Sequence, residues 1–549
     1  MAERERERAK MRRLRAWLSQ SPKVKVCAKE EQHTENYASE SSSSSPTKPF
    51  EQIPGPKPLP VLGNVWRYLP LIGEYKLDQL FDNSKLNYKL YGPIVREQIN
   101  KKHTILHLFD PNDIETLFRL DGSCPLRRSH RALLKYRLDR KELYSSGGLF
   151  PENGFAWERL RKLFQARLMS KKEVAKLTDK IDRTVRKSLV EKLSSQIIES
   201  TQTKLHLSAF EQCLSEWAFA TSLEVFLDTQ LSSELSADEI ELTMEQLHAT
   251  LVAIDGTELH SEKWLTKPSK CKYYTKLVES QTYLHGFVEK RIHKAIERHK
   301  SQASESNNSS EYSLLYDWLQ VDGIDERDVI LFVIDALLAG YHTTVYTGAH
   351  LLFQLYKNEH ILDELRSHPP ASDEQDELLE RCLKETMRLN PVSIGTGRVV
   401  QHGNAIVRNF CIPRDTMVIA QTQHSSLNAE IFSDEPNSFR PDRWIEYRKL
   451  DRLERPSAFA SLPFGFGPRV CIGKRVATLQ LKALARSLIE HFDIEFMQDS
   501  ILTRTTLIHN IAKPIEVRVG LRLQPTENQP KSSQSNSMDQ SQSQARKSE

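Results

Sequence analysis

The sequence lacks paired cysteines. Its seven cysteines are scattered over 549 residues, none forms a CxxC pair, and their number is odd. This pattern indicates neither a disulfide framework nor a zinc site. It favours a reducing compartment, in which each cysteine is a small buried hydrophobe unless a motif assigns it another role.

The chain also lacks a strong excess of either charge. Its 77 Lys and Arg residues oppose 73 Asp and Glu residues, which gives a net charge of +4. Because proteins that bind nucleic acid need a marked basic surface, we expect no nucleic-acid partner. The content of 39% hydrophobic and 27% charged residues is typical of a soluble globular protein.

Long uncharged runs are scarce. The longest stretch without Asp, Glu, Lys or Arg covers residues 336–356, close to the ~20 residues that a membrane span needs. Two His, three Thr, two Gly and a Gln lie within it, and these suit a membrane poorly. We therefore expect a helix buried in a large domain rather than a transmembrane helix.

The N-terminal composition differs from that of the interior. Residues 11–29 hold six basic side chains and no acid, with apolar residues at helical spacing, which is typical of a mitochondrial transit peptide. The preceding acids Glu3, Glu5 and Glu7 do not suit such a peptide. Two alternatives stay open, a translation start at Met11 or an ordinary basic tail.

Composition divides the chain into three parts. We predict a transit peptide and disordered linker over residues 1–50, one large folded domain over 51–524, and a disordered Gln- and Ser-rich tail over 525–549. A Ser- and Asn-rich stretch at 301–310 reads as a surface loop of the domain.

Helical periodicity dominates the predicted domain. The predicted helices cover 158–169, 205–227, 274–298, 325–356, 377–389 and 476–492. Shorter β-like runs lie at 104–109, 405–413 and 416–421, and "IPRDT" (412–416) is a hairpin-turn signal. The predicted fold class is therefore mainly α with small β-sheets.

A glycine-rich loop precedes the last predicted helix. The segment PFGFGPRVCIGKRVA (463–477) contains three glycines and brings Cys471 to the helix start. Backbone amides and the helix dipole at that position favour a thiolate over a thiol. Such a thiolate is either a nucleophile, which needs a base, or a ligand of a soft metal, and no residue adjacent to Cys471 is a histidine.

This loop resembles the signature of the cytochrome P450 haem-thiolate monooxygenases. Every fixed position of FxxGxRxCxG is matched, by Phe464, Gly467, Arg469, Cys471 and Gly473. The resemblance implies a cytochrome P450 fold with haem (iron protoporphyrin) as cofactor. It also implies that Cys471 is the axial ligand of the haem iron, with the other four residues around the cofactor.

Another motif of that family precedes the signature. Glu385 and Arg388 match ExxR, one helical turn apart on one face, and FRPDRW (439–444) supplies Arg443. The resemblance implies that these three side chains form a buried ion network with a structural role. Asp442 stands where the family more often has Glu.

The resemblance also points to partners for the haem propionates. Trp157 and Arg161 match the WxxxR element, in which both side chains reach a propionate. Arg398 in GTGRVV and Arg469 in the signature match further propionate partners. Guanidinium groups suit carboxylates because each donates a planar fork, although each arginine taken alone would more often be a surface charge.

The predicted helix 325–356 carries a polar stripe. At 100° per residue, an arc of roughly 120° holds Asp335, Ala339, His342, Thr343, Tyr346, Thr347 and His350. A polar stripe on a buried helix predicts the lining of a cavity. Ala339, Gly340, Thr343 and Thr344 resemble the family's oxygen-activation motif (A/G)Gx(D/E)T(T/S), which implies catalytic roles for Gly340 and Thr343.

The acid of that motif is missing. His342 occupies the position from which the acid helps to relay protons. Three interpretations stay open: His342 replaces the acid in the relay, the relay is impaired, or His342 is a packed core histidine. Imidazole can pass protons near neutral pH, so the first predicts a turnover rate that depends more strongly on pH than in a relative with the acid.

The basic presequence and the lack of an N-terminal anchor resemble the mitochondrial class of the family. The class implies a peripheral protein on the matrix side of the inner mitochondrial membrane, with electrons from an acidic adrenodoxin-type ferredoxin and its NADPH-dependent reductase. Docking candidates on the Cys471 side are Arg381, Lys384, Lys474 and Arg475, each equally readable as solvated charge.

Several segments resemble one group within that class, the arthropod disembodied group of steroid C22-hydroxylases in ecdysteroid synthesis. They are YLPLIGEY (68–75), YGPIVRE (91–97), CPLRRSHRALLKYR (124–137), GLFPENG (148–154) and RLNPVSIGTGR (388–398). The resemblance implies O2-dependent hydroxylation of an ecdysone precursor at C22. The alternatives are another mitochondrial sterol hydroxylase, a haem-thiolate isomerase or dehydratase that needs no external electrons, and a haem carrier or sensor.

Overall fold

The computed structural model describes residues 47–522, apart from 70, 102, 201, 261–262, 305–311, 402, 404 and 433. The predicted transit peptide and C-terminal tail, and most of the predicted loop at 301–310, lie outside the described residues. Within them the chain is mainly helical with small sheets, which confirms the predicted fold class.

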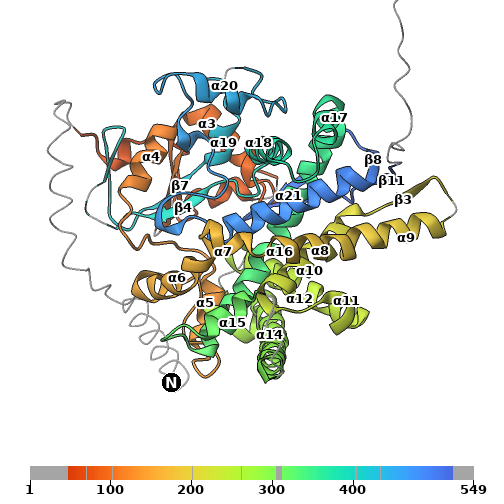
Figure 1. Cartoon of the computed structure of the whole chain (residues 1–549). Helices are drawn as coiled ribbons and strands as arrows, with labels where there is room; N and C mark the ends of the chain where they lie inside the picture. The colour runs from red at the N-terminus through yellow and green to blue at the C-terminus, as the bar shows by residue number, and fades with distance from the viewer. Residues whose placement is uncertain are drawn as a thin grey trace, which may run out of the picture.

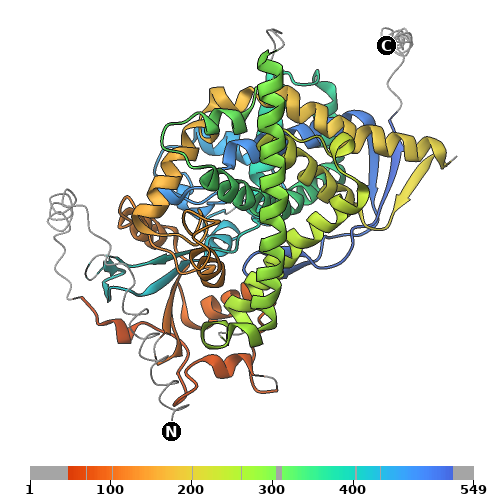
Figure 2. The same ribbon diagram turned by 90° about the horizontal axis from the view of Figure 1, so that it is seen from below.

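Helices make up most of the described chain (Figure 1). They are α3 (Leu80–Tyr91), α4 (Pro111–Arg119), α5 (Arg131–Leu138), α6 (Gly154–Leu168), α7 (Lys171–Ala175), α8 (Thr178–Val185), α9 (Lys192–Glu199), α10 (Phe210–Leu227), α11 (Leu231–Glu234), α12 (Ala237–Asp255), α13 (Lys263–Thr266), α14 (Lys272–Ser304), α15 (Leu314–Leu319), α16 (Glu326–Lys357), α17 (Glu359–Ser367), α18 (Asp373–Leu389), α19 (Thr422–Ser426), α20 (Arg443–Lys449) and α21 (Lys474–His491). Seen from below, the long green helix α14 runs from one edge of the molecule through its middle (Figure 2).

The long helix α16 passes through the centre of the fold. It begins with a capping box, in which the Asp325 side chain accepts from the backbone while Asp328 bonds back to the cap. Its apolar surface then packs against α10, α14, α18 and α21. Among the described residues α16 alone is long and apolar enough to cross a membrane, but 67% of its most apolar window is buried inside the protein, as expected of a core helix.

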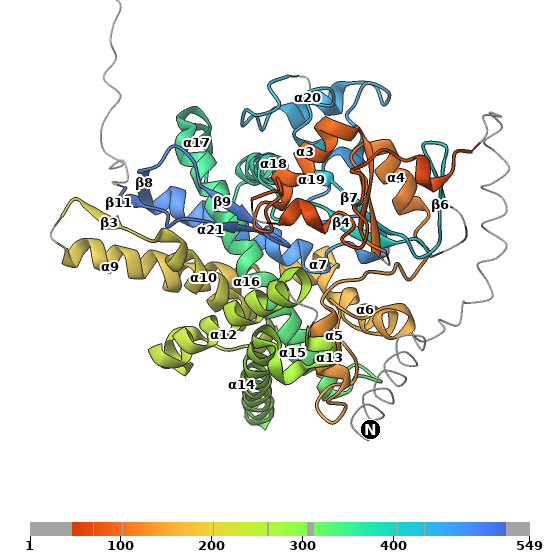
Figure 3. The same cartoon turned by 180° about the vertical axis from the view of Figure 1, so that it is seen from behind.

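The strands form two small sheets and two hairpins. One sheet has the order β1 (Ile94–Asn100), β2 (His103–Leu108), β7 (Met417–Ala420) and β4 (Thr396–Val399), with β2 and β7 parallel. The other sheet has the order β3 (Lys204–Leu207), β11 (Val517–Leu521) and β8 (Phe492–Phe496). The hairpins are β5 (Ala405–Val407) with β6 (Phe410–Ile412), and β9 (Thr503–Thr505) with β10 (His509–Ile511). The two sheets lie at opposite sides of the helices (Figure 3).

Two sequence predictions about local structure were wrong. The predicted helix 205–227 begins only at Phe210, because residues 204–207 pair with β11 as strand β3. The "IPRDT" segment is not a hairpin turn, since β6 pairs with β5 while β7 pairs with β2 and β4. The hairpin turn lies instead at Arg408 and Asn409, both with the positive φ that a tight two-residue turn requires.

Candidate functional site

Cys471 lies in a backbone-held loop between the short turn η7 (Gly467–Arg469) and α21. Its amide donates to the Phe464 carbonyl at 2.9 Å, which closes the loop. Gly465 and Gly467 have φ of 74° and 71°, the left-handed region that favours glycine. A Cβ built on either of them, or on Gly473, would meet no atom within 4 Å. These glycines therefore shape the loop and leave open space beside it.

The Cys471 thiol is surrounded by protein and yet keeps exposed surface. Burial raises the pKa of this thiol, and the opposing hydrogen bonds from the Gly473 and Lys474 amides and the charges of Arg161 and Arg127 do not outweigh it. The sequence-based expectation of a thiolate is thus wrong for the protein without a cation, because desolvation exceeds the helix-terminus effect. A metal cation in place of the proton would reverse that balance.

Four arginines gather around Cys471. Burial and mutual repulsion lower the pKa of Arg127 to about 9 and of Arg469 to about 8, with Arg161 and Arg398 among the repelling charges. Arg398 is paired with Asp121, its Nε lying 2.5 Å from the carboxylate Oδ2. So much buried positive charge beside one carboxylate indicates that further negative charge belongs at this place.

Two of these guanidiniums keep unused donors. Arg127 Nε and Arg398 Nη2 are buried without a hydrogen-bond partner among the described residues. A buried donor without an acceptor costs roughly 1–3 kcal/mol, so an absent acceptor is expected here. The two propionates of a haem would supply acceptors and negative charge together, and the Cys471 thiol suits its iron. The residues present therefore fit a haem.

Arg469 holds the Cys471 loop to the segment before α6. Its guanidinium lies 3.9 Å from the Trp157 ring centroid and donates at 2.8 Å and 3.0 Å to the Glu152 and Pro125 carbonyls. Arg161, one helical turn after Trp157, donates to Gln165 at 3.1 Å. The structure thus brings Trp157, Arg161 and Arg469 together, with most Arg469 donors already used by the protein.

One turn of α16 has accessible surface. Between residues 328 and 353 all of its residues are buried except Ala336, Ala339, Gly340, His342 and Thr343, which share one region of the helix. The Thr343 hydroxyl donates to the Ala339 carbonyl at 2.5 Å. The accessible face is therefore centred on Gly340, as the oxygen-activation motif would require.

The predicted polar stripe is longer than this face. Asp335, Tyr346, Thr347 and His350 are buried, so the prediction that they line a cavity was wrong for these four. The Asp335 carboxylate lies 2.7 Å from the Arg137 guanidinium, a partner outside the helix that periodicity alone does not reveal.

His342 has a specific partner. Its Nε2 lies 3.3 Å from Nδ1 of His248 on α12, and the ring centroids are 5.4 Å apart. Burial and the neighbouring imidazole lower the pKa of His342 to about 4, so the side chain is neutral near pH 7. The His248 side chain is exposed.

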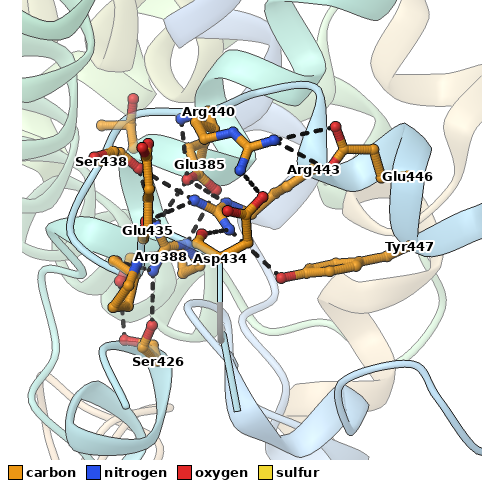
Figure 4. Close-up of polar contacts among 12 residues, drawn as sticks. Glu385, Arg388, Ser426, Asp434, Glu435, Ser438, Arg440, Arg443, Glu446 and Tyr447 are labelled. Atoms are coloured by element: carbon orange, nitrogen blue, oxygen red, sulfur yellow. Dashed lines mark hydrogen bonds and ion pairs between the residues drawn. The ribbon is translucent and has the colours of Figure 1, made fainter. Parts of the chain in front are cut away.

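The Glu385 network is complete and buried (Figure 4). Arg388 donates to both Glu385 oxygens, at 3.0 Å and 2.8 Å, and Arg443 Nε donates to one of them at 2.8 Å. All three side chains are at most 1% exposed. The remaining guanidinium donors reach the backbone carbonyls of Ser426, Asp434, Glu435 and Pro436.

The predicted docking residues differ in exposure. Lys384, Lys474 and Arg475 are exposed, although Lys384 Nζ lies 3.9 Å from the Trp444 ring centroid. Arg381 is only 11% exposed and lies 2.9 Å from the Asp442 carboxylate. The charge of Arg381 is therefore largely neutralised by an ion pair within the protein.

Sequence reasoning missed three residues of the site. Arg127 is one of two adjacent arginines in "LRRS", and nothing local separates it from Arg128, which is exposed. Asp121 and His248 carry no motif, and their partners are 277 and 94 positions away along the chain. Only the fold brings them to the site.

Two buried histidines, His350 and His509, and the half-buried His424 predict acid-sensitive stability. Burial lowers the pKa of His424 and His509 to about 4 and of His350 to about 3, against about 6.5 in an unfolded chain. Protons therefore bind preferentially to the unfolded state between pH 6.5 and 4, and the stability contributed above pH 6.5 is lost as the pH falls through that window.

We expect a loss of about 1.2 kcal/mol per histidine at pH 5.5 relative to pH 7. Chemical denaturation at a series of pH values measures this loss. Replacing His424 by Gln should flatten the curve, whereas the exposed His206→Gln variant should leave it unchanged; equal slopes in both would contradict the assignment.

An accessible, deeply set cysteine facing buried arginines defines a haem-thiolate site. The sequence profile of the family described as Cytochrome P450 matches residues 53–519, so the chain belongs to the cytochrome P450 family. This confirms the predicted fold, the haem cofactor and the classification as a monooxygenase.

Relatives are similar over most of their length. The chain is 29% identical over 494 residues to "Cytochrome P450 302a1, mitochondrial" of Drosophila melanogaster, covering 86% of this chain and 96% of the relative. It is 26% identical over 467 residues to "Probable cytochrome P450 301a1, mitochondrial" of the same species, covering 82% and 83%. It is 27% identical over 460 residues to the mouse "1,25-dihydroxyvitamin D(3) 24-hydroxylase, mitochondrial", covering 82% and 84%.

Proposed function

We propose that this monooxygenase hydroxylates the side-chain C22 of an ecdysone precursor in mitochondria. Relatives named as mitochondrial proteins, one of them a hydroxylase of a sterol-derived hormone, support the compartment and the substrate class. The segments that resemble the disembodied group support the position of attack. In this proposal residues 1–50 direct import, 51–524 form the enzyme on the matrix side of the inner membrane, and 525–549 form a tail.

The observation that supports monooxygenase chemistry is an exposed Cys471 thiol beside arginines whose buried N–H donors have no hydrogen-bond partner among the described residues. When bound there, haem supplies the activation of O2 and the transfer of one oxygen atom to a C–H bond. Cys471 would hold the iron as a thiolate, and Arg127 and Arg398 would bind propionate with their unused donors. Arg469 and Trp157 would keep the Cys471 loop in position.

The accessible face of α16 would do the remaining protein chemistry. Gly340 keeps the helix backbone close to α10, because a Cβ at this position would lie only 3.2 Å from the Ser222 Oγ. The Thr343 hydroxyl, which already donates to the Ala339 carbonyl, can accept a hydrogen bond in return. His342 would act as a proton donor beside this hydroxyl, at the position where the family's oxygen-activation motif has an acid.

Electron supply by an acidic ferredoxin rests on the exposed docking residues. We expect Lys384→Glu combined with Lys474→Glu to raise the KM for ferredoxin at least tenfold at low salt, since steering by rim charges depends on their sign. The maximal rate at saturating ferredoxin should change little. Steady-state kinetics with ferredoxin varied at several salt concentrations measure the effect.

A matched control is Lys513→Glu, an exposed lysine on the connection between β10 and β11. This variant should behave as the wild type. An unchanged KM in the double variant would exclude docking at that surface.

Reconstitution tests the proposed function against its rivals. Purified protein is supplied with an adrenodoxin-type ferredoxin, its reductase, NADPH and an ecdysone precursor, and products are identified by mass spectrometry. Hydroxylation at C22 supports the proposal, and hydroxylation of another sterol or position selects a different sterol hydroxylase. Turnover of hydroperoxides without ferredoxin selects an isomerase or dehydratase.

A further inference from the structure

His248 and His342 form a pair that spans two helices. His248 lies on α12 and is exposed, whereas His342 lies on the accessible turn of α16 beside Thr343. The 3.3 Å between His248 Nδ1 and His342 Nε2 is hydrogen-bond distance, so one ring can donate to the other. The pair therefore links an exposed side chain on α12 to the accessible face of α16.

The geometry points to His248 as the solvent-side partner of His342 in proton delivery. The inference rests on the proposed monooxygenase function and adds a residue to it. A proton taken from water at His248 Nε2 lets the Nδ1 proton pass to His342 Nε2, and His342 then releases a proton from Nδ1. Each imidazole accepts on one nitrogen and donates from the other, so the net charge of the pair is unchanged after each transfer.

The overall chemistry needs this supply. Hydroxylation consumes one O2, two protons and two electrons, and it yields one hydroxyl group on the substrate and one water. The electrons come from NADPH through the proposed ferredoxin, and the protons come from bulk water through the pair. A carboxylic acid at position 342 could do this alone, whereas a desolvated imidazole with a low proton affinity needs a neighbour that exchanges with water.

The charged groups around the two histidines affect how proton delivery depends on pH. Lys276 on α14 and Arg504 on β9 act on His248, and together with burial they lower its pKa. His342 is affected by His248 and by burial, and its ring contacts Tyr341. Because the protonated fraction of His248 falls as the pH rises, proton delivery should slow between pH 6 and pH 8.

The variant that tests the role is His248→Gln. We expect at least a tenfold fall in hydroxylation per electron consumed, with the lost electrons appearing as hydrogen peroxide, because positioned proton transfer typically contributes 10²–10⁴-fold. The fall in rate between pH 6 and pH 8 should disappear. His342→Asp should also remove the pH dependence, while the exposed His206→Gln variant should match the wild type.

A second readout does not depend on turnover. Two imidazole nitrogens about 3.3 Å apart match the edge of a tetrahedral zinc site with bonds of 2.0–2.1 Å, so Zn²⁺ is a probe of the pair. Titration calorimetry of the haem-loaded protein should show a Zn²⁺ site in the wild type that is missing in both His248→Gln and His342→Gln. Zinc at that site should also inhibit the wild type more strongly than His248→Gln.

The possible outcomes distinguish a failure of the proposed hydroxylase function from a failure of the proposed relay through His248 and His342. A wild type that hydroxylates no steroid overturns the proposed function, while the zinc titration still tests the pair. Unchanged coupling in His248→Gln, or a fall in rate between pH 6 and pH 8 that persists in it, overturns the relay role whatever the zinc result. Equal zinc binding in all variants shows that the two rings do not meet in solution, and this also overturns it.

Discussion

Replacing Cys471 by alanine is expected to abolish hydroxylation, with a fall of at least ~10³-fold, while the protein remains folded. The Cys471 sulfur lies beside Arg127 and Arg161, and an alanine would leave the haem iron without its proposed thiolate. Thiolate ligation is what favours cleavage of the O–O bond in this family. The carbon monoxide difference spectrum of the reduced protein measures the ligand directly, and it should lose its thiolate band.

The matched control is Cys411→Ala. Cys411 is half-buried on β6 and pairs through its backbone with β5, so its side chain carries no role in the site. This variant should keep both the thiolate spectrum and turnover. A Cys471→Ala variant with the thiolate band intact would contradict the assignment of the ligand.

Replacing Glu385 by glutamine is expected to destabilise the fold by about 3–5 kcal/mol, because it leaves two fully buried guanidiniums without their carboxylate. The network joins α18 to α20, which begins at Arg443, and its three side chains are at most 1% exposed. Denaturant unfolding of the haem-loaded protein measures the loss. If the glutamine variant gives no folded protein, the charge-conserving Glu385→Asp variant should give partial stability.

Glu377→Gln on the same helix is the control. Glu377 pairs with Arg448 at 3.3 Å, but both side chains are about three-fifths exposed. Removing an exposed pair should change stability by less than about 1 kcal/mol. Equal losses in the two glutamine variants would show that burial of the Glu385 network does not determine its contribution.

Long elements of the fold were predictable from the sequence because their patterns are local. The periodicity of α16, α18 and α21 repeats over many turns, so each was found to within a few residues. Strand β3 was missed because it has four residues and is stabilised by pairing with β11, some 310 positions away. The turn at Arg408 and Asn409 was misplaced because the proline-containing segment beside it carries the stronger local signal.

The site residues likewise fall into two groups, those that a local motif predicts and those that only the packing of the helices brings to the site. Cys471, Glu385 and Arg388 stand in motifs a few residues long, and the spacing alone brings them to one loop or one helix face. Arg127 and His248 act on partners from other elements, so their positions depend on how the helices pack. The pKa of the Cys471 thiol was misjudged because desolvation is a property of the packed protein, whereas the helix start is visible in the sequence.

The measurement that tests the account most directly is oxygen labelling of the product. The haem-loaded protein, ferredoxin, reductase, NADPH and an ecdysone precursor are incubated under ¹⁸O₂, and the product is fragmented in a mass spectrometer. The account predicts one ¹⁸O atom on C22, formed only when ferredoxin is present. Product oxygen derived from water, or product formed at the same rate without ferredoxin, would contradict it.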